Sequence, residues 1–145
     1  MINDSIKVTG QVKLVLVDKD GNVKQTEQSN LVVTTGKAFM ANALVASSTS
    51  PFAYTAVGTG TTAAAVGDTA LTTELVRIAN SSAVVSTAVT FTTVLNAGVG
   101  TGALAEAGLF NQATLGGTML AHVVFGVINK GALDTLTLTW TVTVN

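Results

Sequence analysis

The sequence predicts an all-β protein, a jelly-roll-like β-sandwich of about eight strands with one short helix. Apolar and polar residues alternate along most of the chain, which is typical of strands with one buried face. Turn residues, mainly Gly and Asn, interrupt this alternation roughly every 8–12 residues. The chain has 145 residues and no visible repeat or composition break, so residues 1–145 are expected to form a single domain.

The N-terminal segment predicts a hairpin. Residues 5–17 form the first expected strand, with Val8, Val12, Leu14 and Leu16 on one face and Lys7, Gln11 and Lys13 on the other. Residues 18–22 contain Gly21 and predict the turn. A polar returning strand is expected at about 23–29, followed by a short strand at 31–34.

Residues 35–46 predict the one helix. Its apolar stripe recurs at helical spacing and consists of Phe39, Met40, Ala43 and Leu44. Thr35 has the side chain of an N-cap residue, so we expect it to cap the first turn. Residues 47–50 and Pro51 should end the helix.

The rest of the chain predicts strands separated by Gly-rich loops. Strands are expected at 54–57, 75–79, 84–95, 104–110 and 119–127, with loops at 96–102, 111–117 and 129–131. The clearest strand, 134–144, alternates five Thr with Leu136, Leu138, Trp140, Val142 and Val144. Thr suits the wet face because its β-branch fits a pleated backbone, so Trp140 is expected inside the core.

The composition bounds the possible partners. Charged residues make up 10 % of the chain, hydrophobic residues 48 %, and the mean hydropathy is +0.54. A net charge of −1 provides no basic surface for nucleic acid or anionic lipid. The absence of cysteine excludes disulfides and Cys-based zinc sites. No signal peptide or membrane span is expected, because no apolar run is long enough.

Gly58, Gly60 and Ala63 match the dinucleotide pattern G-x-G-x-x-[GA]. That motif needs a helix directly after it, whose amides hold the pyrophosphate, and an acid about 20 residues later for the ribose. Here the following segment is broken by Gly67-Asp68, and residues 78–82 contain no acid. We therefore expect a loop and no nucleotide cofactor.

Two patterns raise the question of a metal site. Asp18, Asp20 and Asn22 are spaced like the start of a calcium loop, but Gly21 stands at the fourth position and Ser29 at the twelfth, where calcium loops have Gly at the sixth and Glu at the twelfth. His122 is the only histidine and has no Cys beside it to complete a transition-metal site. A hairpin turn and a satisfied core or interface histidine are the expected readings, with no bound metal.

No pattern of residues predicts an enzyme. The chain lacks a G-x-S-x-G elbow and has no acid adjacent to His122. Glu74 and Glu106 are single acids on different strands, which usually cap loops or pair with a cation such as Arg77. We therefore expect no catalytic residues.

Two segments resemble a group of small structural proteins of tailed bacteriophages. They are VGTGTTAAAVGDTALTTELVR (57–77) and EAGLFNQATLGGTMLAHVVFGVINKGALDTLTLTWTV (106–142). The shared pattern runs GTGTT, GDTAL, EL and R, then E-x-G-[LI]-F, G-T-M-L-A, I-N-K-G and D-T-L-T-[IL]-T-W. The opening at 6–44 also fits the start of these proteins. The resemblance is looser at 45–56 and 80–100.

The resemblance implies a virion component without catalytic residues. It implies a capsid decoration (cement) protein, a homo-oligomer (dimer or trimer) on the outer capsid surface, where it binds the major capsid protein and stabilises the head. The alternative is a tail-fibre or receptor-binding element, or another virion surface protein. The length favours decoration, because 145 residues leave little room for a shaft and an anchoring domain. The nearly uncharged stretch 78–129, whose one formal charge is Glu106, suits broad contact surfaces.

Overall fold

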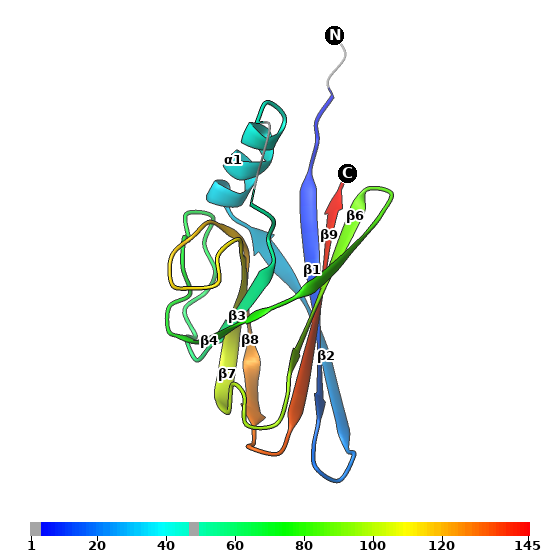
Figure 1. Cartoon of the computed structure of the whole chain (residues 1–145), viewed down its shortest axis with the longest axis vertical. Coiled ribbons are helices and arrows are strands. Elements are labelled where there is room, and N and C mark those ends of the chain that lie inside the picture. The colour runs from blue at the N-terminus through cyan, green and yellow to red at the C-terminus, as the bar shows by residue number, and fades with distance from the viewer. Residues whose placement is uncertain (1–3, 47–49) are drawn as a thin grey trace.

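The computed structural model describes residues 4–46 and 50–145 and shows an all-β protein with one short helix (Figure 1). The all-β class predicted from the alternation is therefore confirmed. The described residues contain nine strands: β1 (Val8–Val17), β2 (Val23–Val32), β3 (Tyr54–Gly58), β4 (Glu74–Ala79), β5 (Ser81–Val85), β6 (Ala88–Leu95), β7 (Gly102–Phe110), β8 (Met119–Lys130) and β9 (Thr135–Val144). The helix α1 spans Thr34–Ala43.

The strands form one antiparallel sheet in the order β4-β3-β7-β8-β2-β1-β9-β6-β5. The ladder between β1 and β9 runs without a break from Val8 opposite Val144 to Val17 opposite Thr135. The alternation in both strands matches this pairing, since the apolar residues of β1 face those of β9. Val12 lies opposite Trp140, and Leu14 lies opposite Leu138.

The sheet has two halves, one formed by β1, β2, β9, β6 and β5 and the other by β8, β7, β3 and β4. The chain passes between them four times: within β2, between β4 and β5, between β6 and β7, and between β8 and β9. β2 pairs with β1 along most of its length but with β8 only at Leu31 and Val32. β4 and β5 follow each other with only Asn80 between them, yet β4 pairs with β3 and β5 pairs with β6. The nearly closed sheet is consistent with a β-sandwich or barrel, and Figure 1 shows β3, β4, β7 and β8 on one side of β1 and β9.

The core lies between these two halves. Trp140 is fully buried, which confirms its predicted position, and it shares the core with apolar residues of both halves: Val12, Leu14, Leu136, Leu138, Leu104, Ala107, Leu109 and Val123. One buried polar contact also joins the halves, since Thr93 on β6 donates a hydrogen bond of 2.8 Å to the hydroxyl oxygen of Thr55 on β3.

Residues 84–95 do not form the single strand predicted. They contribute to two strands, β5 and β6, which form a hairpin with Val84 opposite Val89. Ser86 lies in the turn at a φ of 56°, a left-handed conformation that favours glycine. The turn consists of Ser86 and Thr87, so the sequence has no Gly, Pro or Asn here to predict it.

The helix also differs from the prediction at both ends. α1 begins at Thr34, with Val33 in the N-cap position and no side-chain capping bond. Thr35 is inside the helix, and its hydroxyl donates to the Met119 carbonyl oxygen at 3.0 Å. The prediction that Thr35 caps α1 is therefore wrong. Leu31 and Val32 end β2 instead of forming a separate strand. α1 ends at Ala43, before the predicted end at Ala46, and of the residues expected to stop it, 47–49 lie outside the described residues.

Candidate functional site

The loop 59–73 covers the second face of the sheet half that contains β3, β7 and β8. Residues Leu104 to Phe110 of β7 are all buried, and Leu104, Ala107 and Leu109 belong to the main core. Phe110 belongs to a smaller cluster with Val33, Ala56, Leu71 and Met119, to which the loop contributes Leu71. This loop contains most of the first segment on which the phage resemblance rests.

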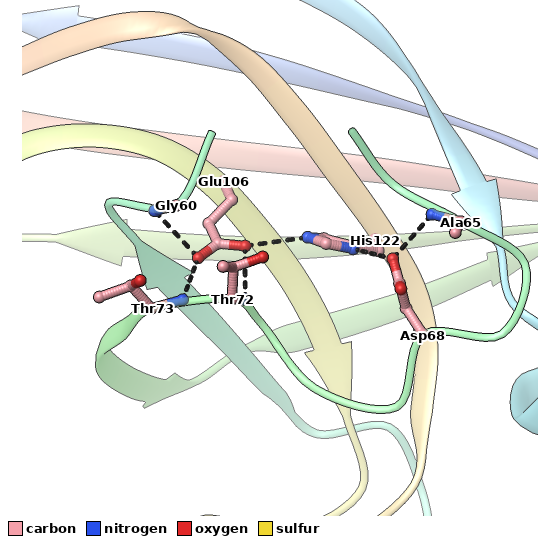
Figure 2. Close-up of polar contacts among 7 residues, drawn as sticks. All are labelled: Gly60, Ala65, Asp68, Thr72, Thr73, Glu106 and His122. Atoms are coloured by element: carbon pink, nitrogen blue, oxygen red, sulfur yellow. Dashed lines mark hydrogen bonds and ion pairs between the residues drawn. The ribbon is translucent and has the colours of Figure 1, made fainter. Parts of the chain in front are cut away.

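Glu106 of β7 is fully buried under this loop and accepts four hydrogen bonds (Figure 2). Its Oε1 accepts from the backbone N–H of Gly60 at 3.0 Å and of Thr73 at 2.7 Å. Its Oε2 accepts from the backbone N–H of Thr72 at 3.0 Å and lies 3.0 Å from Nε2 of His122. Protein donors therefore replace the water that this carboxyl group loses on burial.

The two glycines of the apparent nucleotide motif allow this approach. A Cβ on Gly60 would collide with Oε1 of Glu106 and with the Thr72 side chain. A Cβ on Gly58 would collide with the Thr73 carbonyl oxygen. After Gly60 the chain has no helix before β4, so the helix that a pyrophosphate site requires is not present at this position. The two glycines leave room for the carboxylate of Glu106, which belongs to the same chain.

His122 of β8 connects Glu106 to Asp68 in the middle of the loop. Its Nδ1 lies 2.7 Å from Oδ2 of Asp68, and the same oxygen accepts from the Ala65 N–H at 2.8 Å. The ring is buried, whereas the Asp68 side chain is 27 % exposed. An imidazolium is the form of His122 that donates to both carboxylates. The prediction of a satisfied core histidine is confirmed by these contacts.

The charge of Asp68 is favoured by its neighbours. Partial burial on its own would raise the pKa of this carboxyl, but the hydrogen bond from Ala65 and the bond and charge of His122 together lower it below 3.8. An ionised Asp68 therefore holds the 65–68 turn against β8, while Glu106 holds residues 60, 72 and 73. The chain Asp68–His122–Glu106, here called the carboxylate–histidine network, fixes the loop at both ends.

The geometry of this network determines its chemistry. A catalytic histidine needs one ring nitrogen free to exchange a proton with a nucleophile or substrate. Both nitrogens of His122 are occupied by carboxylates, and the side chain is 2 % exposed. Among residues 4–46 and 50–145, no three His, Asp or Glu side chains are arranged to hold a metal ion. The network therefore supports the loop structurally.

Glu74 and Glu106 are not paired with each other. Glu74 instead forms a two-point ion pair with Arg77, at 2.8 Å through Nε and 2.9 Å through Nη2. Arg77 also donates through Nη1 to three carbonyl oxygens of the next loop, those of Gln112, Thr114 and Gly116, and its guanidinium lies 3.8 Å from the Phe110 ring centre. These contacts match the predicted roles of single acids, one pairing with Arg77 and one capping a loop.

The first aspartate of the apparent calcium loop is used by the hairpin turn itself. Oδ1 of Asp18 accepts from the N–H groups of Asp20 and Asn22 at 2.8 and 2.9 Å, and Oδ2 accepts from the Asn22 side chain at 2.9 Å. Hydrogen bonding from the Asn22 side chain is the main reason that the pKa of Asp18 is lowered. Gly21 has a φ of 84°, as a tight turn requires.

Sequence reasoning identified Glu106 and His122 singly but not their partners. Asp68 was noted only because it interrupts a helix, and Thr72 and Thr73 contribute backbone groups, which leave no side-chain signal. The sequence feature that points to Asp68 is its position directly after Gly67, in a loop between apolar segments. An Asp in a turn is expected to accept backbone hydrogen bonds.

Comparison with protein families, with curated proteins and with solved structures found no match to this chain. Within the part of the chain that the structure describes, no helix is both long and apolar enough to cross a bilayer.

Proposed function

We propose that the chain is a non-enzymatic decoration (cement) protein of a tailed-phage capsid, which binds the outer surface of the major capsid protein shell and stabilises the head. One observation carries the proposal. The segments that resemble phage structural proteins, GTGTT at 58–62, GDTAL at 67–71 and E-x-G-[LI]-F at 106–110, meet in the loop and network of Figure 2. These three parts of the shared pattern therefore belong to one structural feature.

The distribution of exposed side chains supports a contact role. At one end of the molecule, α1 and the start of β1 border a groove of about 610 Å³ lined by apolar residues that include Ile6, Met40 and Leu44. Leu44 is 87 % exposed and Ile6 is 77 % exposed. The β1–β2 turn, with Asp18, Lys19 and Asp20, lies at the opposite end (Figure 1). We propose that the groove end contacts the shell and the charged turn faces solvent.

Cementing requires only that each copy bridges neighbouring capsid subunits. The shell cannot open until these bridges break, so many modest interfaces add up to a large barrier. A stable specific contact should bury upwards of about 1,000 Å². With Lys7 and Lys37 the charged residues that line the groove, binding should rest on apolar and backbone contacts and persist at high salt.

The test uses phage heads from which this protein has been removed, taken from a phage that encodes it. Adding it back should restore their resistance to heat and osmotic shock, at both low and high salt. Leu44→Glu should weaken rebinding about tenfold or more, because it places a charge in an apolar contact. Val23→Glu makes the same change at the opposite end of the fold, where Val23 is 61 % exposed, and should rebind normally.

The tail-fibre alternative gives the reverse result. Stripped or deleted particles would keep their physical resistance and lose adsorption to the host. Copy number separates the two readings independently, because a decoration protein occurs in hundreds of copies and a fibre in a few to a few tens. Heads that are equally stable with and without the protein would refute the decoration proposal.

A further inference from the structure

The strand β5 ends the sheet and leaves one of its edges open. It pairs with β6 from Ser81 opposite Thr92 to Val85 opposite Ala88. Among the described residues, no backbone hydrogen bond joins β5 to any other segment. The outward-facing N–H and C=O groups of β5 are therefore available to a further strand.

This edge has none of the features that normally prevent strand pairing. Proteins protect their edges with charged side chains, proline, bulges or a covering segment. β5 reads Ser-Ser-Ala-Val-Val, contains no charge or proline, and is exposed at every position. Val84 is 70 % exposed and Val85 is 75 % exposed. The strand at the other end of the sheet, β4, differs because it contains the ion pair of Glu74 and Arg77.

We propose that β5 pairs with β5 of a second copy of this chain, antiparallel and about a twofold axis, so that one sheet continues across both molecules. When all five residues pair, residue 81 lies opposite 85, and Ala83 lies opposite its own symmetry mate. Such self-pairing normally brings like charges together, but β5 has none. A second copy also presents an edge of the same length and composition, as an isologous interface requires.

The expected dimer is reversible. An interface made of one five-residue strand on each side is smaller than the roughly 1,200–2,000 Å² of a standard specific interface. Its stability comes from backbone hydrogen bonds and from covering Val84 and Val85. We therefore expect a dimer that dissociates on dilution and resists salt, since no ion pair takes part.

The test measures association of the purified protein by analytical ultracentrifugation from about 1 µM to about 1 mM. The wild type should shift from monomer to dimer. Ala83→Lys and Ala83→Glu should each raise the dimer dissociation constant at least about tenfold, because like charges meet at the axis. An equal mixture of the two variants should form a heterodimer. Ala103→Lys adds the same charge at an exposed position of β7, inside the sheet, and should dimerise like the wild type.

Three results would overturn the proposal. They are a wild type that stays monomeric over the whole range, an oligomer that survives both single substitutions, and single variants that fail to associate even when mixed. Circular dichroism and the fluorescence of Trp140 verify that each variant is folded before it is scored. Because no capsid is present, the result is independent of the proposed function.

Discussion

Replacing Glu106 by Gln tests whether the carboxylate–histidine network stabilises the fold. The substitution keeps the shape of the side chain and converts one acceptor oxygen into an NH2 donor. If the amide oxygen keeps the bonds from Gly60 and Thr73, the new NH2 group faces the N–H of Thr72 and Nε2 of His122. Two contacts that were hydrogen bonds then become donor facing donor.

The expected loss follows from the number of donors left unpaired. A buried donor without a partner costs about 1–3 kcal/mol. If His122 releases its Nε2 proton and accepts from the new amide, only the Thr72 N–H remains unpaired and the loss is about 1–3 kcal/mol. If His122 stays protonated, two donors are unpaired and the loss is about 2–6 kcal/mol. These losses compare with the roughly 5–15 kcal/mol that stabilises a typical domain.

Urea unfolding followed by Trp140 fluorescence measures this loss as a change in the unfolding midpoint at constant slope. Amide exchange at Gly60, Thr72 and Thr73 should accelerate more than exchange in β1 and β9, because the loop loses its attachment first. Glu27→Gln makes the same chemical change at an exposed position of β2 and should stay within about 0.5 kcal/mol of the wild type. A Glu106→Gln midpoint equal to that of Glu27→Gln would refute the reasoning.

Three further predictions concern the glycines of the loop 59–73, Asp68 and Lys130. Gly60→Ala should cost about 1–3 kcal/mol in urea unfolding, because its Cβ meets Glu106, whereas Gly67→Ala, whose Cβ would meet nothing within 4 Å, should be nearly neutral. The pKa of Asp68 in the folded protein lies below the unfolded value of 3.8. Asp68 therefore stabilises the fold above pH 3.8, and this stabilisation is lost as the pH falls through the folded pKa. Asp68→Asn should make the urea midpoint depend less on pH in this acid range. Burial lowers the pKa of Lys130 below 10.5, although the nearby charge of Asp134 acts in the opposite direction. The folded protein therefore loses this proton before the unfolded chain does, so the urea midpoint should rise as the pH increases from the folded pKa toward 10.5. An unchanged slope in Lys130→Met would contradict this last assignment.

The strands whose alternation matches their burial were predictable from sequence. β1 and β9 have one apolar and one polar face, so period-2 reading located both strands and placed Trp140 in the core. The β5–β6 turn was not predictable, because Ser86 adopts a left-handed conformation without being Gly, Asn or Asp. The start of α1 was misplaced by one residue because Thr35 uses its hydroxyl for a tertiary contact with Met119 instead of a cap.

The network was beyond sequence reasoning for a different reason. Asp68 and His122 are 54 positions apart, and their contact depends on the loop 59–73 crossing the outer face of β7 and β8. The glycine spacing at Gly58 and Gly60 was physically informative all the same. Glycines let backbone N–H groups approach an anion closely, and here the anion is Glu106 of the same chain instead of a phosphate.

The ladder between β1 and β9 governs how this protein must fold. It joins residues far apart in the chain, and β6 depends on β9 for the pairing of its inner edge as well. This ladder therefore forms only after a loop of more than a hundred residues has closed, with the large entropic cost that such closure carries. On the ribosome, β1 and β2 can form their hairpin early, but the hairpin must wait with one edge open until β9 has been synthesised. We expect slow, cooperative folding in which the pairing of β9 completes the core.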